Sequence, residues 1–304
     1  YSSYGDNPSY YHPPFERFVR TEVLKGSEQI LFGPQTIGGV INYITAAPPI
    51  EMRGMLSLLG GNRNTFNGRL RLGSNGLLME MVRKQGDGSR ANEAPKLTDV
   101  NFKGLSTWGK HHALAVRANY YNENSLVTYT GITEAEYRNS GIRYNPFKND
   151  EFKVNRYGLS ATYDVQLAEN IALVTSVYGS KFDRDWWRQS STTTDGQGGT
   201  GVRDTRLAGL RIDPDTIEST QGRLRKYSTY GVEPRHSLHH RLFEIENEFS
   251  VGVRAHYENQ KRQQKNGKTP TARDGDLVEN NERFTDAYSG FAQNRFLLGQ
   301  WTLT

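Results

Sequence analysis

Residues 18–45 read FVRTEVLKGSEQILFGPQTIGGVINYIT, and this stretch decides the fold expected for the start of the chain. It predicts a strand, a tight turn, a short helix, a Gly-Pro turn, a Gly-Gly pair and a second strand. Glycine permits turn conformations that residues with a Cβ avoid, and proline presets a turn angle. Val40, Ile41 and Ile44 give the second strand its β-branched character. Pro48 and Pro49 end the unit, because proline donates no backbone hydrogen bond.

Length and hydropathy limit the class of protein. The 304 residues could form one large domain or two ordinary ones. Mean hydropathy is −0.74, and no stretch approaches the roughly 20 apolar residues of a membrane helix. A transmembrane barrel escapes that criterion, because only every second residue of its strands faces lipid. The composition therefore excludes a helical membrane protein and leaves a barrel open.

Single residue types narrow the choice further. Cysteine is absent, which excludes disulfides, thiolate catalysis and cysteine-bound metal. The 17 tyrosines and 31 glycines suit a barrel with aromatic girdles, and would also suit a β-sandwich. A net charge of +5 fits either a solvated surface or a lumen that attracts anions. The basic residues are scattered, which argues against nucleic acid as a partner. No signal peptide is visible, and residues 1–14 read as a polar loop from the middle of a protein.

From Glu51 onward the dominant period is two, with one apolar and one polar face. The apolar faces mix Ala, Gly, Tyr and Leu, as a lipid-facing wall does, whereas a soluble sandwich buries bulky aliphatic residues. The clearest alternations place apolar residues at Phe66, Gly68, Leu70 and Leu72; at Leu114, Val116, Ala118 and Tyr120; at Tyr157, Leu159, Ala161, Tyr163 and Val165; and at Val251, Val253, Ala255 and Tyr257. This pattern favours a transmembrane antiparallel barrel.

Strand and turn lengths agree with that interpretation. Short turns are expected at 60–64, 73–76, 109–111 and 168–170, and long polar excursions at 85–97, 122–152, 190–237 and 262–282. Tight turns at one end and long loops at the other are typical of outer-membrane barrels. The predicted strands are 51–60, 65–73, 77–85, 98–108, 111–122, 154–166, 171–188, 240–250, 251–262 and 283–298, with an eleventh from Gln300.

Two features predict that the chain is part of a longer protein. Strands 240–250 and 251–262 have no turn residues between them, so a missing turn is expected between Ser250 and Val251. The chain also stops inside a strand at Trp301 to Thr304. A barrel that encloses a globular plug needs on the order of 22 strands, so about ten strands correspond to half of one.

The runs VLKG at 23–26 and GPQTIGGVIN at 33–42 resemble the plug domain of TonB-dependent outer-membrane transporters. The resemblance implies that residues 1–50 are the C-terminal part of a small α+β plug domain. Residues 51–304 would then be the N-terminal half of an all-β transmembrane barrel in the bacterial outer membrane. It further implies uptake of a ferric chelate without catalysis and without a cofactor. The implied partners are the TonB energy-coupling complex, outer-membrane lipid and lipopolysaccharide.

Within that superfamily the barrel looks most like the ferric dicitrate receptor branch. The resembling runs are RKY at 225–227, GVEPR at 231–235, NPFKND at 145–150 and YTGITEAEY at 129–137. The resemblance implies that Arg225 helps to bind an iron–citrate anion. A second basic position falls at Asp183, beside Arg184, and a third falls near Arg262, with Gln264 in the aligned place.

These residue types suit an iron–citrate anion, because the guanidinium group of arginine forms two parallel hydrogen bonds with a carboxylate. Arg235 joins the set as a further candidate ligand-binding residue. The alternative is that Arg184, Arg225 and Arg235 are ordinary charges on loops and strand ends. Two of the three basic positions depart from the branch pattern, which leaves the cargo open between ferric citrate, another siderophore, cobalamin and a metal ion.

Other signals receive structural interpretations. The GxGxxG run at 196–201 lacks the strand-to-helix context of a dinucleotide site and reads as a flexible extracellular loop. Trp186 and Trp187 are assigned to an outer aromatic girdle. His236, His239 and His240 read as strand-end or loop residues, and Glu244, Glu246 and Glu248 as a polar lumen wall in contact with the plug. A β-barrel enzyme or adhesin is the alternative class, and a passive porin is disfavoured by residues 18–45.

Overall fold

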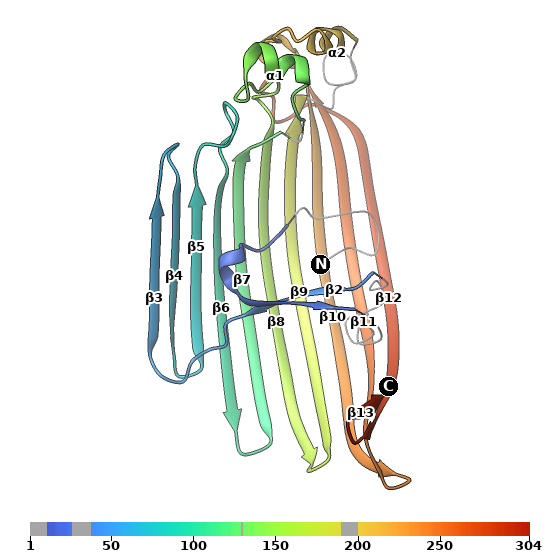
Figure 1. Cartoon of the computed structure of the whole chain (residues 1–304). Coiled ribbons are helices and arrows are strands. Elements are labelled where there is room, and N and C mark those ends of the chain that lie inside the picture. The colour runs from blue at the N-terminus through green and yellow to red at the C-terminus, as the bar shows by residue number, and fades with distance from the viewer. Residues whose placement is uncertain (1–10, 26–37, 129, 190–199) are drawn as a thin grey trace.

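The computed structural model describes residues 11–25, 38–128, 130–189 and 200–304. Within them the backbone forms one large antiparallel sheet of eleven strands and one separate sheet of two strands. The small sheet crosses in front of the large one, near the middle of its strands (Figure 1). No described helix is both long and apolar enough to span a membrane.

The N-terminal sheet pairs the two strands expected around residues 18–45. A 3-10 turn, η1 (Phe15–Arg17), leads into β1 (Phe18–Leu24), which pairs antiparallel with β2 (Val40–Thr45). Both predicted strands are therefore confirmed. The short helix and the Gly-Pro turn predicted between them fall on 26–37, outside the described residues.

The large sheet is a meander in which every strand pairs with its neighbours in sequence. It is not closed, because β3 and β13 lie at its two edges. The strands are β3 (Arg53–Gly60), β4 (Phe66–Ser74), β5 (Leu77–Gln85), β6 (Lys96–Trp108), β7 (His112–Leu126), β8 (Glu151–Ala168), β9 (Ile171–Arg188), β10 (Thr220–Leu242), β11 (Ile245–Gly267), β12 (Asp276–Leu298) and β13 (Trp301–Leu303).

The predicted break between Ser250 and Val251 is wrong. β11 runs through both residues, and Val251 pairs with His236 without a change of register. The chain turns instead at Phe243 and Glu244, which have φ angles of 52° and 65°. This turn was missed because two-residue hairpins usually place Gly, Asn or Asp at positive φ, and here a Phe and a Glu occupy those positions.

The predicted long loop 190–237 is also wrong at its C-terminal end, since β10 begins at Thr220. Pro234 lies inside β10, although a proline inside a sheet removes a ladder hydrogen bond. The strand tolerates it by a local interruption. Glu233 and Pro234 drop out of the pairing with β11, while the pairing with β9 continues through both.

The two ends of the sheet differ as expected. Turns at 75–76, 109–111, 169–170 and 243–244 are tight and lie at one end, whereas the loops 127–150, 189–219 and 268–275 lie at the other. The long loops contain α1 (Glu134–Ser140), α2 (Thr200–Leu207) and the 3-10 turn η4 (Pro214–Thr216). Figure 1 shows α1 and α2 beyond the loop end of the central strands.

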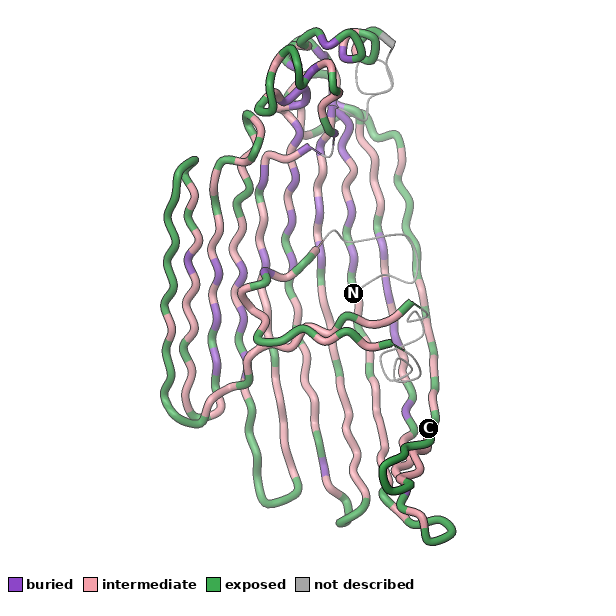
Figure 2. The backbone as a smooth tube through the Cα atoms, viewed as in Figure 1, coloured by how far each residue is buried: buried purple, intermediate pink, exposed green. Residues whose placement is uncertain are grey.

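The two faces of the sheet separate as the period of two predicts. On β8, Tyr157 and Leu159 are 54% and 62% exposed on the outer face, away from the N-terminal sheet. Arg156, which precedes Tyr157 on the same strand, points to the opposite face, where it is buried and covers the Tyr11 ring. An aromatic and aliphatic core lies on this inner face and comprises Tyr121, Phe152, Val154, Phe182 and Tyr227. Buried positions concentrate on the central strands (Figure 2).

Contacts from the N-terminal sheet reach several strands of this inner face. Arg17 lies 3.4 Å from the Asp99 carboxylate, and Lys84 lies 2.8 Å from Glu16. Lys103 donates hydrogen bonds to the Thr45 hydroxyl and the Ala46 carbonyl. Polar side chains on the inner face of the large sheet thus form hydrogen bonds and ion pairs with the N-terminal segment, as buried polar groups require.

The register between β9 and β10 can be tested by cross-linking. Ser180 and Thr229 are paired, with their hydroxyl oxygens 2.7 Å apart, and the chain has no cysteine of its own. Directly opposite residues place their Cβ atoms about 4.5–5.5 Å apart, near the separation that a disulfide needs. We expect a Ser180→Cys/Thr229→Cys protein to form the disulfide under mild oxidation, detected by mass spectrometry of the linked peptides. The matched pair Ser180→Cys/Ser228→Cys places the thiols on opposite faces, and its cross-linking to the same extent would contradict the register.

Candidate ligand-binding site

Three arginines lie side by side on the inner face of the large sheet. Arg225 of β10 pairs with Arg184 of β9 on one side and with Arg262 of β11 on the other. We call these three residues the arginine row. Because β10 pairs with β9 on one side and with β11 on the other, Arg184 and Arg262 come close although they are 78 positions apart in the sequence.

Two members of the arginine row are buried, and Arg262 is half-buried. Arg184 and Arg225 are 5% and 7% exposed. Arg225 donates to the carbonyls of Leu224 and Gln263, at 3.0 and 3.2 Å. The Glu279 carboxylate lies 4.0 Å from Arg262. Like charges directly opposite each other destabilise a sheet, so the row gains from an added anion.

More cations and aromatic groups extend the row toward the loops. Arg223 pairs with Trp186 on β9 and with Gln264 on β11. The Arg188 guanidinium lies 4.7 Å from the centre of the Trp186 ring. Sequence reasoning missed Arg188 and Arg223, although the alternation 184, 186, 188 on one strand and 223, 225 on the next carries the signal.

The predicted site residues divide into two groups. Arg184, Arg225, Arg262 and Gln264 come together, and Asp183 points to the outer face, where Lys226 lies 3.6 Å from its carboxylate. Arg235 lies apart, ten residues farther along β10, or roughly 33 Å at about 3.3 Å per residue. It pairs with Glu233 at 3.2 Å and covers the Phe291 ring.

The assignment of Trp186 to an outer girdle is wrong. Trp186 packs edge-on against Phe152, with ring centres 5.4 Å apart, beside the inner-face core. Trp187 lies on the outer face and is buried there, and a Cβ added at Gly222 would meet its ring at 2.7 Å. The missing side chain at Gly222 therefore makes room for Trp187, a long-range fit that periodicity cannot reveal.

The remaining singled-out residues take up local roles. Gly196 to Gly199 of the GxGxxG run lie outside the described residues, and Gly201 belongs to α2. The three candidate histidines lie in β10 toward its tight-turn end. Glu246 pairs with Arg241 and Glu248 with Arg295, at 3.2 and 3.1 Å. Among the described residues no group of three or more His, Asp or Glu side chains could hold a metal ion.

The loops beyond the arginine row are tied to each other by a buried ion pair. Arg206 of α2 donates from Nε and Nη2 to the two Glu136 oxygens of α1, at 2.8 and 3.0 Å. Glu136 also accepts from the Thr133 backbone, and Thr133 accepts from the Glu136 backbone, which forms a capping box. The sequence Thr133 to Glu136 has the spacing of that box, and this signal was not used in the sequence analysis.

Two further contacts join the same loops. Asn149 and Lys148 donate to Asp215, at 2.9 and 2.6 Å, and these hydrogen bonds lower the pKa of the Asp215 carboxyl. Arg273 donates to Glu151 at 2.5 Å and to the Asn149 carbonyl at 2.8 Å. The loops 127–150, 189–219 and 268–275 are therefore connected by side chains of both signs.

No known family profile matches the sequence, and no curated protein matches it. The structure is similar to the ferric citrate transporter FecA in its unliganded form, with a TM-score of 0.72 and 19% identity over 93% of this chain and 41% of that chain. It is similar to the ferric-catecholate import receptor Fiu from E. coli K12, with a TM-score of 0.70 and 14% identity over 92% of this chain and 47% of that one.

A third similar structure is the pyoverdine outer membrane receptor FpvA from Pseudomonas aeruginosa PAO1 bound to pyoverdine. Its TM-score is 0.72, at 13% identity over 94% of this chain and 44% of that chain. The chain thus spans less than half the length of each of these three proteins. At these identities the likeness concerns the fold, which is that of part of such a receptor.

Removal of the buried ion pair between the loops gives a test of their coupling. Glu136→Gln leaves the Arg206 guanidinium without its carboxylate, and breaking a buried pair costs about 3–5 kcal/mol. We expect faster amide hydrogen exchange in both 130–150 and 200–219. The control is Glu134→Gln on the same helix, which removes the exposed pair with Arg138, worth about 0.3–0.5 kcal/mol. Faster exchange confined to one loop would show that the pair does not couple the two.

Proposed function

We propose that the chain is part of a TonB-dependent outer-membrane receptor that takes up a ferric chelate of the anionic carboxylate type, such as ferric citrate. The fold supports this proposal, and so does the plug-like sequence at 18–45. The observation that carries it is the arginine row, in which Arg184, Arg225 and Arg262 lie adjacent on the inner face. Nothing in this function changes a chemical bond, so the site residues bind and select.

The chemistry of the row fits an iron–carboxylate anion. Each guanidinium presents parallel N–H groups that match a carboxylate, and the pair is stronger than a neutral hydrogen bond. Burial strengthens these contacts, because water screens them less. Three guanidinia on three strands would meet a cargo that carries several carboxylates, which favours a citrate-type chelate over a neutral cargo.

A second candidate cargo is an aromatic siderophore, and one specific observation favours it. Trp186 and Phe152 lie beside the row, and Arg188 covers Trp186. Such a surface could stack on an aromatic ring. Fiu is an import receptor for a ferric catecholate, and FpvA is a receptor for pyoverdine. Binding measurements with ferric citrate and with a ferric catecholate separate the two cargoes.

The N-terminal sheet is proposed to belong to a plug domain, with residues 1–50 as its C-terminal part and 51–304 as the N-terminal half of a barrel of roughly 22 strands. Its ion pairs and hydrogen bonds to β5 and β6 support this assignment. A passive porin has no such domain. Energy for uptake would come from the TonB complex, which is the proposed partner on the inner side.

The exposed outer face is proposed to contact lipid and lipopolysaccharide. Tyr157, Leu159, Tyr230, Phe284 and Tyr288 are exposed large side chains on this face. Tyr230 and Tyr257 stack across β10 and β11, with ring centres 5.2 Å apart. Tyrosines with one apolar and one polar end suit a membrane interface.

The arginine row predicts the effect of a single substitution. Arg225→Ala should weaken binding of ferric citrate to the full-length receptor by about 10- to 100-fold, because a hydrogen bond to a charged group contributes about 1.5–3 kcal/mol. Binding is measured by isothermal titration calorimetry in detergent. Lys226→Ala is the matched control, since it removes the next cation in sequence from the outer face. Equal affinities of the two variants would remove Arg225 from the site.

The proposed membrane exposure predicts a second effect. Leu159 lies at the middle of β8 on the outer face, and an arginine on the lipid face near the bilayer centre costs about 2–4 kcal/mol. We expect Leu159→Arg to lower the free energy of unfolding in lipid vesicles by that amount, measured by denaturant titration of tryptophan fluorescence. Thr162→Arg, on the inner face of the same strand, is the control. A smaller loss for Leu159→Arg than for Thr162→Arg would contradict a lipid-facing outer surface.

A further inference from the structure

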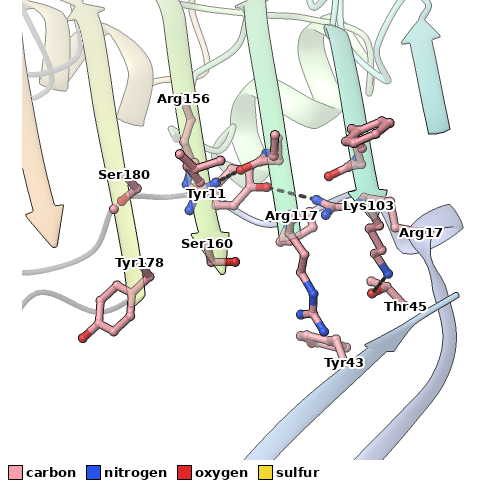
Figure 3. A pocket seen from close by; sticks show the side chains of 18 of the residues that line it. Tyr11, Arg17, Tyr43, Thr45, Lys103, Arg117, Arg156, Ser160, Tyr178 and Ser180 are labelled. Atoms are coloured by element: carbon pink, nitrogen blue, oxygen red, sulfur yellow. Dashed lines mark hydrogen bonds between the residues drawn. The ribbon is translucent and has the colours of Figure 1, made fainter. Parts of the chain in front are cut away.

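A cavity of about 230 Å³ lies between the N-terminal sheet and the inner face of β6 to β10. Figure 3 shows its side chains, which come from the N-terminal segment on one side and from the strands on the other. Its volume is below the roughly 300–1,000 Å³ of pockets for drug-sized ligands. It therefore suits a small molecule rather than a complete large siderophore.

Four cations line this cavity: Arg17, Lys103, Arg117 and Arg156. None of the described residues that line it is an aspartate or a glutamate. Asp99, which lies 3.4 Å from Arg17, offsets one of the four charges. The hydroxyl groups of Ser160 and Ser180 add uncharged donors to the lining. Cations and donors without carboxylates form a site for an anion.

Three of the four cations have contacts that hold them in place. Lys103 is bonded to Thr45 and Ala46, and Arg17 to Asp99. Arg156 donates to Asn119 and covers the Tyr11 ring at 4.8 Å. These residues could serve the packing of the N-terminal sheet alone.

Arg117 differs from them. It is exposed although it lies on the inner face of β7, opposite Lys103. Within the described residues no hydrogen bond or ion pair of its guanidinium is recorded. Its side chain extends toward Tyr43 of the N-terminal sheet (Figure 3). A cation held next to Lys103 without a carboxylate raises the energy of the empty cavity, and an anion would lower it.

The cavity and the arginine row lie on the same strands. Ser180 and Thr229 line the cavity, four residues from Arg184 and Arg225, which is roughly 13 Å along a strand. Between the two lie Phe182 and Tyr227, which are part of the inner-face core. A carboxylate that leaves the arginine row along this face therefore meets the cavity next.

We propose that this cavity is a second anion subsite, which binds a small di- or tricarboxylate after the arginine row and next to the N-terminal sheet. The ligand is the carboxylate group itself, either iron-free or as part of a ferric complex. The order of the two sites, with the arginine row first, rests on the proposed function. The preference of the cavity for an anion rests on its lining residues alone. Because Lys103 and Thr45 link the lining to β2, movement of the N-terminal sheet would open the subsite.

The test uses the full-length receptor in detergent, titrated with citrate alone and, separately, with ferric citrate. We expect two binding events for the wild type. Arg117→Ala should weaken the weaker event by about tenfold or more, as loss of a charge-assisted contact does, and leave the stronger one unchanged. Arg225→Ala should do the opposite. Arg117→Lys keeps the charge and should retain both events, while Lys181→Ala, which removes an outer-face cation opposite Tyr157, should alter neither.

The outcomes separate the two proposals. If Arg117→Ala leaves both binding events unchanged while Arg225→Ala weakens one, the subsite is wrong and the receptor function stands. If the wild type binds citrate in an Arg117-dependent way but binds no ferric chelate, the subsite stands and the proposed cargo is wrong. Citrate binding without iron that is lost on addition of iron would assign the subsite to the free acid. Retained heat-modifiable mobility on gels confirms that each variant is folded.

Discussion

The whole structure depends on backbone pairing between strands that holds one register across the sheet. β10 pairs with β9 over 18 positions and with β11 over 21 positions, and neither pairing has a register shift. Since successive side chains point to opposite faces, a slip of one residue would move every arginine of the row to the apolar side. The register therefore decides at once which side chains lie on the apolar outer face and which lie on the charged inner face. The positive-φ turn at Phe243 and Glu244 fixes this register between β10 and β11.

The inner face concentrates cations in two places. One is the arginine row with Arg223 and Arg188, and the other is the cavity around Arg117. Between them lies the aromatic core of Tyr121, Phe182 and Tyr227. Elsewhere on the same face acids balance the cations, as Glu80 does for Arg71 at 2.5 Å. Gathering like charges on a buried face costs free energy, so an anionic ligand would stabilise these two places.

Contacts close the inner face from two sides. On one side Glu16 and Arg17 of η1 and Thr45 of β2 contact the strands. On the other side the loops are joined by Arg206 and Glu136, a pair that is fully desolvated. A buried pair specifies an arrangement more than it stabilises one, so this pair fixes how α1 and α2 lie against each other. A cargo between these two layers would be shielded from water, and its contacts would be stronger for that reason.

The sequence by itself determined the alternation of faces, most strand positions, the pair of strands at 18–45 and the candidacy of Arg184, Arg225, Arg262 and Gln264. Periodicity and turn residues are local, so they can be read without the fold. Tertiary structure alone decided that three of these arginines are neighbours, that Arg235 lies far from them and that Trp186 faces inward. It also decided where β10 and β11 begin. Pairing with strands on both sides keeps β10 continuous through Pro234, and the chain turns at Phe243 and Glu244. Such pairings join residues dozens of positions apart, and no local pattern records them.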